Sequence, residues 1–167
     1  TNIGVIGYGN IGRRLCKKLY YLGFNCFYYD PNINKINKYS RKISNIKFFL
    51  KKCHVVSIHC TLNKTTKNLV NSKFLNLMRK NASLINTARG KIFSDLNIVL
   101  KHLKKNNSFS FGLDVLPTEP PIENEKLIKF WKKNIFNGRL LINPHTAYYS
   151  SRSIVSMREK ASKNILT

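Results

Sequence analysis

Short apolar runs alternate along the chain with longer polar stretches in which apolar residues recur at every third or fourth position. The runs have the length of buried strands, and the spaced positions are typical of helices that bury one face. Strands are expected at residues 2–7, 24–30, 54–60, 82–87, 108–115 and 139–143. Helices are expected at residues 10–23, 46–52, 71–80, 94–106 and 150–166. Residues 31–45 are predicted to be a polar, lysine-rich link.

The alternation of strands and helices predicts an α/β fold, a doubly wound and largely parallel sheet of the Rossmann type. The first helix shows the pattern clearly, with Ile11, Leu15, Leu19 and Leu22 at helical spacing before Gly23 ends it. A chain of 167 residues with 43% hydrophobic content suits one domain, residues 1–167. Ligands of such sheets bind at the carboxyl ends of the strands.

The beginning of the chain and its cysteines bear on its origin. It enters an apolar strand without a methionine or a leader, so we expect a piece of a longer protein, and no apolar run approaches a membrane span. The four cysteines, separated by 10, 27 and 7 positions, lack zinc or redox spacing and indicate buried thiols in an intracellular protein, cytoplasmic or nuclear. The histidines His54 and His59 fit structural roles at strand ends, and no metal is expected.

The net charge of +23 ordinarily indicates a polyanionic partner. Here the lysines are spread from Lys17 to Lys163 among many asparagines and isoleucines, a mixture that an AT-rich coding bias explains equally well. Weak attraction to polyanions is expected, but no specific nucleic acid and no membrane partner.

A glycine motif follows the first strand. Gly7, Gly9 and Gly12 have G-x-G-x-x-G spacing, and a helix begins at Asn10. This order allows a tight turn, close approach of a pyrophosphate to the backbone, and helix amides that face its charge. Asp30 ends the next strand, 18 positions after Gly12, where a carboxylate accepts hydrogen bonds from ribose hydroxyls and repels a 2′-phosphate. The motif and the acid together predict a dinucleotide site that favours NAD over NADP. The alternative to such a site is a glycine-rich turn beside a solvent-facing aspartate.

Polar residues follow three later strands. Arg89 precedes a helix that Ser94 is expected to cap. Its guanidinium suits a substrate carboxylate, although a lone arginine is more often a surface ion pair. Asp114 and Glu119 follow the next strand, and His145 the last. A carboxylate bound to the imidazole fixes its tautomer and favours its protonated form, so His145 is interpreted as an acid/base.

The segments "GVIGYGNIG", "VSIHCTLNKTTKNLVN", "LMRKNASLINTARG" and "LINPHTAYYSSRSIVSMREKA" resemble the NAD-binding domain of the D-isomer-specific 2-hydroxyacid dehydrogenases. Within that superfamily the chain is most similar to the carboxy-terminal-binding protein branch of transcriptional corepressors. The likeness covers nearly the whole chain.

The resemblance implies roles for individual residues. Arg89 binds the substrate carboxylate, Glu119 orients His145, and His145 exchanges a proton while hydride moves between NAD and C2 of a 2-hydroxy or 2-keto acid. Tyr148, where the corepressor branch has tryptophan, borders the substrate pocket. The implied cofactor-binding residues are Gly7, Gly9, Asn10, Ile11, Gly12, Asp30, Cys60, Thr61, Thr87, Ala88 and Asp114.

Some features depart from the family or leave the role open. Lys91, Ser94 and Asp95 replace a glycine and an Asp-Glu pair, and the Glu119–His145 connection is longer. The family's substrate domain is absent, so we expect this piece to bind NAD(H) but turn over poorly. The parent is either an enzyme or an NAD(H)-sensing corepressor that binds transcription-factor peptides, and the resemblance implies a homodimer. A hydrophobic peptide cleft in the missing N-terminal region would distinguish the two.

Overall fold

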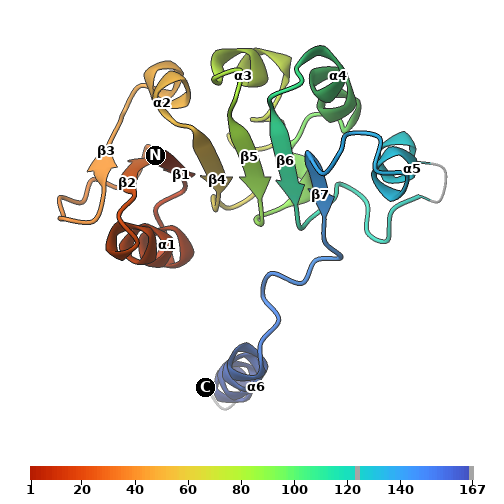
Figure 1. Cartoon of the computed structure of the whole chain (residues 1–167). Coiled ribbons are helices and arrows are strands. Elements are labelled where there is room, and N and C mark those ends of the chain that lie inside the picture. The colour runs from red at the N-terminus through yellow and green to blue at the C-terminus, as the bar shows by residue number, and fades with distance from the viewer. Residues whose placement is uncertain (123–124, 166–167) are drawn as a thin grey trace.

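A parallel sheet forms the centre of the molecule. The computed structural model describes residues 1–122 and 125–165, and in them seven strands lie in the order β3-β2-β1-β4-β5-β6-β7, every pair parallel (Figure 1). The strands are β1 (Asn2–Ile6), β2 (Asn25–Tyr29), β3 (Arg41–Lys42), β4 (Val55–Ile58), β5 (Ser83–Asn86), β6 (Ser110–Leu113) and β7 (Leu140–Ile142). The predicted α/β doubly wound fold is therefore confirmed.

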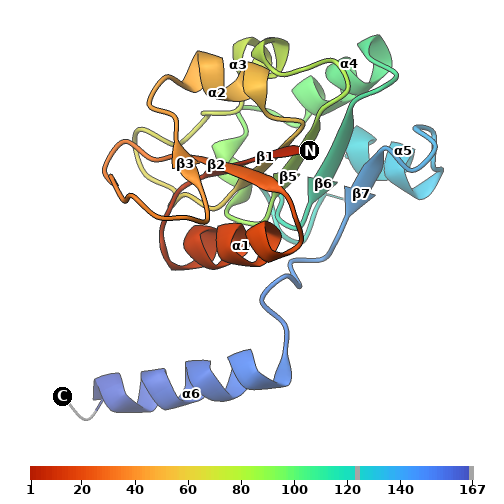
Figure 2. The ribbon, with the colours of Figure 1, turned by 60° about the vertical axis from the view of Figure 1, so that its left-hand side comes forward.

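Helices lie on both faces of this sheet (Figures 1 and 2). They are α1 (Asn10–Tyr21), α2 (Ile46–Lys52), α3 (Ser72–Leu77), α4 (Asn97–Lys105), α5 (Lys126–Lys132) and α6 (Ser151–Ile165), with a 3₁₀ turn, η1, at Gly90–Ile92. Helix α1 covers one face, α2 to α4 cover the other, and α5 packs beside β7. The strand order reverses between β1 and β4, which makes their carboxyl ends the expected place for a ligand.

The α1 face has a small core of its own, separate from the larger one under α2 to α5. Tyr8, Cys16 and Tyr28 are buried there, and Leu15 and Leu19 of the predicted helical stripe pack against them. Ile11 and Leu22, the ends of that stripe, are 67% and 71% exposed. Three of the four cysteines are buried as expected, and Cys60 is half-buried, all of them free thiols.

The start of α4 differs from the prediction. Ser94 does not cap it, because its amide donates to the Val70 carbonyl at 3.0 Å and the preceding Phe93 forms a bridge with Val70. This pairing holds Ser94 away from the helix, which starts at Asn97. The Asp95 carboxylate accepts the Asn97 amide at 2.9 Å instead.

Two elements within polar stretches were not expected. β3 lies inside the predicted link of residues 31–45 and pairs with β2. Helix α5 lies in the connection between Glu119 and His145, anchored by the buried Leu127 and Ile128. Helix α3 begins at Ser72, with the Asn71 side chain accepting from the Phe74 amide as its cap, and it ends at Leu77, before the predicted end at residue 80.

Helix α6 forms as predicted but extends away from the sheet in both views (Figure 2). None of its residues is buried. The predicted last residue of this helix, Leu166, lies outside the described residues. So do Thr167, the end of the predicted domain, and residues 123–124 of the long connection. Among the helices of residues 1–122 and 125–165, none combines the length and apolar content that a bilayer crossing requires.

Candidate active site

The turn after β1 needs glycine at two of its three motif positions. Gly7 has a φ of 90°, and a Cβ on it would lie 2.5 Å from the Cys60 amide nitrogen. A Cβ on Gly12 would lie 2.2 Å from the Gly7 carbonyl oxygen. Without side chains at Gly7 and Gly12, α1 and the turn can pack closely against the ends of β1 and β4. A Cβ on Gly9 would meet nothing within 4 Å, so this side of the turn is open to a ligand.

The start of α1 offers amides to an anion. Gly9 is the N-cap, no side chain caps the helix, and its first turn contains no acidic residue. The first amides of a helix have no partner within it and carry partial positive charge. The amides of Asn10, Ile11 and Gly12 therefore fit a diphosphate, as the glycine motif predicts.

A cavity of about 350 Å³ lies beside this turn, and five predicted cofactor residues line it: Gly7, Gly9, Asp30, Cys60 and Thr61. The Asp30 carboxylate is held in place by the backbone. Its Oδ2 accepts the Tyr8 amide at 2.8 Å, and its Oδ1 accepts the amides of Asn32 at 2.9 Å and Ile33 at 3.1 Å. Since a carboxylate has about four acceptor positions, Asp30 can still accept from a ribose hydroxyl.

His59, interpreted from the sequence as structural, also lines this cavity. Its Nε2 lies 2.8 Å from Ser57 Oγ, and its Nδ1 lies 3.4 Å from Thr87 Oγ1. Burial lowers the pKa of His59, so the ring is neutral near pH 7. The ring thereby joins the cavity wall at β4 to the predicted cofactor residue Thr87 after β5.

Cys60 and Thr61 complete that wall. Burial raises the pKa of the Cys60 thiol to about 11, which leaves it protonated and a poor nucleophile. The Thr66 hydroxyl donates to the Thr61 carbonyl at 2.6 Å and fixes the loop after β4. These two residues therefore shape the cavity rather than react in it.

Arg89 is positioned by two neighbours that the sequence interpretation missed. The buried Asn86 side chain accepts the Ala88 amide and donates to the Arg89 carbonyl, both at 3.0 Å. The Arg89 guanidinium donates to the Ala88 carbonyl at 2.7 Å. A Cβ on Gly90 would lie 2.0 Å from the Leu116 carbonyl carbon, so only glycine lets the Arg89 loop pack on the loop after β6.

The carboxylate and the imidazole meet as predicted. His145 Nδ1 lies 2.7 Å from Glu119 Oε2, and Glu119 Oε1 accepts the Leu116 amide at 2.7 Å. Burial raises the pKa of Glu119, but the Leu116 amide, His145 and the charge of Arg89 outweigh it and lower the pKa overall. The anionic Glu119 holds the proton on Nδ1 and leaves Nε2 of His145 available for exchange.

Asp114 organises the backbone around the imidazole. The His145 amide donates to the Asp114 carbonyl at 2.8 Å, and the buried carboxylate accepts the amides of Thr146 and Ala147. His145 has a φ of 54°, in the left-handed region, and these bonds hold it there. The contact of Asp114 with nicotinamide stays a prediction.

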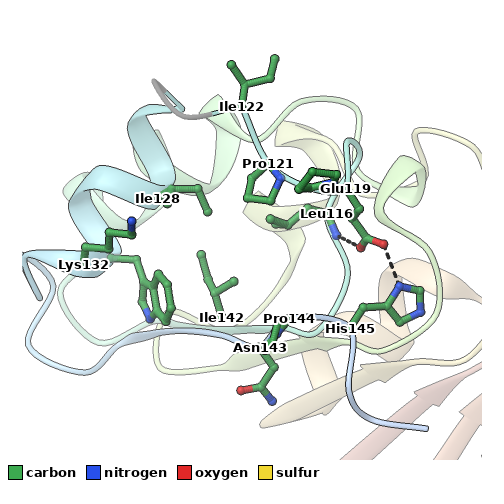
Figure 3. A pocket seen from close by; sticks show the side chains of 12 residues that line it. Leu116, Glu119, Pro121, Ile122, Ile128, Lys132, Ile142, Asn143, Pro144 and His145 are labelled. Atoms are coloured by element: carbon green, nitrogen blue, oxygen red, sulfur yellow. Dashed lines mark hydrogen bonds and ion pairs between the residues drawn. The ribbon is translucent and has the colours of Figure 1, made fainter. Parts of the chain in front are cut away.

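An apolar cavity of about 610 Å³ lies behind the ion pair, between α5 and β7 (Figure 3). Pro121, Ile128 and Ile142 form part of its wall, and Glu119 and His145 stand at one end. Tyr148 packs edge-on to His145 with ring centroids 5.9 Å apart and is 54% exposed. The imidazole therefore has both an apolar cavity wall and an accessible tyrosine as neighbours.

In residues 1–122 and 125–165, no group of three histidines, cysteines or carboxylates is arranged to hold an ion. This edge of the sheet brings together a guanidinium, a carboxylate and an imidazole, beside the glycine turn.

The fold and the site together define an α/β dinucleotide-binding domain with an acid/base pair at the same edge of the sheet. Residues 1–147 match the family described as the NAD binding domain of D-isomer specific 2-hydroxyacid dehydrogenase. The chain belongs to this family.

Relatives and solved structures agree with this assignment. The chain is 32% identical over 168 residues to a glyoxylate reductase of Thermococcus litoralis, and the match covers 98% of this chain and 47% of that protein. It resembles the NAD-complexed D-isomer specific 2-hydroxyacid dehydrogenase of Lactobacillus delbrueckii ssp. bulgaricus with a TM-score of 0.86 and 27% identity, over 99% of this chain and 52% of that one.

The D-lactate dehydrogenase of Lactobacillus jensenii with NAD+ gives a TM-score of 0.82 and 28% identity, over 95% of this chain and 49% of that one. This chain thus spans about half the length of the relatives it matches.

Proposed function

We propose that the protein is an NAD-dependent oxidoreductase that interconverts small 2-keto and 2-hydroxy acids. The observation that carries the proposal is the Glu119–His145 pair at 2.7 Å, held on the same sheet edge as Arg89 and the glycine turn. An acid/base next to a fixed cation and a dinucleotide site suits hydride transfer at a carbonyl beside a carboxylate. The family membership and the relatives named glyoxylate reductase and D-lactate dehydrogenase support it.

Each residue of the site has a separate role in the proposed reaction. Bound NADH supplies the hydride that adds to C2 of the keto acid. Arg89 holds the substrate carboxylate with paired N–H donors and polarises the adjacent carbonyl. His145 gives the Nε2 proton to the carbonyl oxygen as the alkoxide develops, and Glu119 stabilises the imidazolium state and keeps Nδ1 protonated. Tyr148 borders the position of the C2 substituent and influences which acid is accepted.

The second wall of the substrate site is expected from the rest of the protein. Since the chain spans about half the length of its relatives, we propose that a further domain closes over Arg89 and His145. Closure excludes water and strengthens the electrostatic contacts of a site. On its own this chain is expected to bind NADH and to turn over slowly.

Three narrower statements also remain proposals. Homodimerisation is implied by resemblance alone and is tested by sedimentation of the full-length protein. An intracellular location, cytoplasmic or nuclear, rests on the four free cysteines. The corepressor role rests on the sequence likeness, and the relatives reported above carry enzyme names instead. Capture of transcription-factor motif peptides by the full-length protein would support that role.

The test is NADH oxidation by the full-length protein with glyoxylate, pyruvate and longer 2-keto acids, followed by chiral analysis of the product. We expect turnover of at least one acid with D configuration wherever the product is chiral. Arg89→Ala should lose about 10²-fold or more in kcat/KM, whereas Arg79→Ala, an exposed arginine outside both cavities, should lose none. Binding of NADH without turnover of any 2-keto acid would contradict the proposal.

A further inference from the structure

The loop after Asp30 forms one side of the cofactor cavity. Pro31, Asn32 and Ile33 line the cavity beside the acid, and the loop continues to Ser40 without a helix. A loop of this kind ordinarily has several conformations. Its position decides which groups face the adenosine ribose, so the contacts that hold it bear on cofactor choice.

Tyr8, the residue between Gly7 and Gly9, reaches into this loop. Its side chain is 2% exposed and its ring stacks on Tyr28 with centroids 3.8 Å apart and planes 14° apart. Its hydroxyl lies 2.6 Å from Ser40 Oγ, and the Asn37 amide group donates to it at 3.0 Å. One buried side chain of the glycine motif therefore holds the far end of the loop.

The stacked partner holds the middle of the loop. The Tyr28 hydroxyl donates to the Lys35 carbonyl and accepts the Lys35 amide, both at 2.9 Å. The near end is held by Asp30, whose carboxylate also accepts the Tyr8 amide. The glycine turn, the acid and the loop are thus tied together through Tyr8, by its backbone at one end and its hydroxyl at the other.

The charges around the cavity show what this tie achieves. The chain has 30 lysines and arginines in 167 residues, yet none of those in residues 1–122 and 125–165 lines the cofactor cavity, whose charged side chain is Asp30. The loop itself carries Lys35 and Lys38. The Tyr28 hydroxyl fixes the Lys35 backbone, and Lys35 does not line the cavity; Lys38 lies over the Tyr39 ring, 5.6 Å from its centroid, in a different hollow.

We propose that Tyr8 is a specificity-positioning residue, whose hydroxyl holds the loop of residues 31–40 so that Asp30 faces the ribose and the loop lysines stay away from the place of a 2′-phosphate. The discrimination against NADP then depends on the tether as well as on the carboxylate, because a released loop can bring a lysine toward that phosphate. The proposal rests on the NAD site of the proposed function but not on the substrate chemistry.

The experiment titrates NADH and NADPH into the full-length protein carrying Tyr8→Phe, Ser40→Ala or both, with binding followed by nucleotide fluorescence. Tyr8→Phe keeps the ring and its stacking and removes the hydroxyl. We expect the NADH Kd to rise about fivefold, as for loss of one buried hydrogen bond, while the NADPH Kd stays equal or falls. Ser40→Ala should act in the same direction, and the double variant should be no weaker than Tyr8→Phe alone.

Matched measurements separate this role from a structural one. Tyr21→Phe, on an exposed tyrosine of α1, should leave both Kd values unchanged. Equal weakening of NADH and NADPH in the variants, or an unchanged ratio, would overturn the proposal. Should Tyr8→Phe fail to fold, Ser40→Ala decides, since it removes the same contact from the loop side. Failure of the wild-type protein to bind either nucleotide would contradict the NAD site itself rather than the tether.

Discussion

Gly90→Ala tests how the Arg89 loop is joined to the loop that carries Glu119. The added Cβ would lie 2.0 Å from the carbonyl carbon and 2.1 Å from the carbonyl oxygen of Leu116, and 2.3 Å from the nitrogen of Pro117. All three atoms belong to backbone, so no side-chain rotation relieves the contact. The two loops must separate, and because the Leu116 amide binds Glu119, the separation moves the carboxylate as well.

The size of the effect follows from these distances. Ordinary contact begins at 3.4 Å, so the backbones must move apart by about 1.4 Å, from 2.0 Å, along this line. Overpacking of this kind costs about 1–3 kcal/mol in the free energy of unfolding. Displacement of catalytic groups by about 1 Å costs about 10²-fold in rate. We therefore expect turnover to fall about 100-fold while the Kd for NADH changes less than about threefold, since the glycine turn follows β1 and not β5 or β6.

The assay combines NADH titration, steady-state turnover and urea unfolding of the full-length protein. Gly112→Ala in β6 is the matched control, because its Cβ would lie 3.6 Å from Ile85, at ordinary contact distance. It should change turnover little. Full activity of Gly90→Ala would refute the reasoning, because it would mean that the loops tolerate separation. A loss of NADH binding as large as the loss of turnover would refute it equally.

Three further changes probe other contacts. Arg89→Lys keeps the charge but not the paired donors, so kcat/KM should fall at least about tenfold with the NADH Kd unchanged. An unaffected kcat/KM would contradict paired hydrogen bonding of Arg89 to the substrate carboxylate. Burial lowers the pKa values of His59 and His102, so at acidic pH the unfolded chain binds more protons than the folded protein. The free energy of unfolding should be highest above the unfolded-state pKa of 6.5 and should fall as the pH drops below it. His102→Phe should reduce this dependence on pH in urea unfolding. Equal stability at pH 7.5 and 5.5 would contradict the prediction. Asp114→Ala removes the carboxylate that accepts the amides of Thr146 and Ala147 and should lower both kcat and the free energy of unfolding, the latter by about 1–3 kcal/mol, so unchanged stability would rule out that anchoring role.

Much of the fold could be predicted because its signals are local. Apolar runs and helical spacing mark most strands and helices, and their alternation implies the parallel sheet. The exceptions have physical causes: β3 has two residues and takes its register from β2, and α5, with seven residues, is too short to show a repeating helical pattern. The false cap at Ser94 arose because a sequence does not show the bridge between Phe93 and Val70.

The candidate site divides in the same way. Residue types suited to chemistry, such as Arg89 and His145, stand out where they follow strands. The groups that position them do not, because their roles depend on contacts across the fold. Gly90 looks like any turn glycine until the backbone of Leu116 is seen against it, and Tyr8 occupies a variable position of the glycine motif although it ties the turn to Ser40.

We infer that one edge of the sheet holds two separable functions, dinucleotide binding at the glycine turn and proton exchange at the Glu119–His145 ion pair. It is tested most directly by measuring NADH Kd and single-turnover hydride transfer on the same preparations of wild type, Arg89→Ala, Glu119→Gln and His145→Ala. We expect Kd values within about threefold of wild type and hydride transfer slower by about 10²-fold or more in each variant. Retained hydride transfer in His145→Ala, or Kd values that rise in step with the loss of rate, would contradict it.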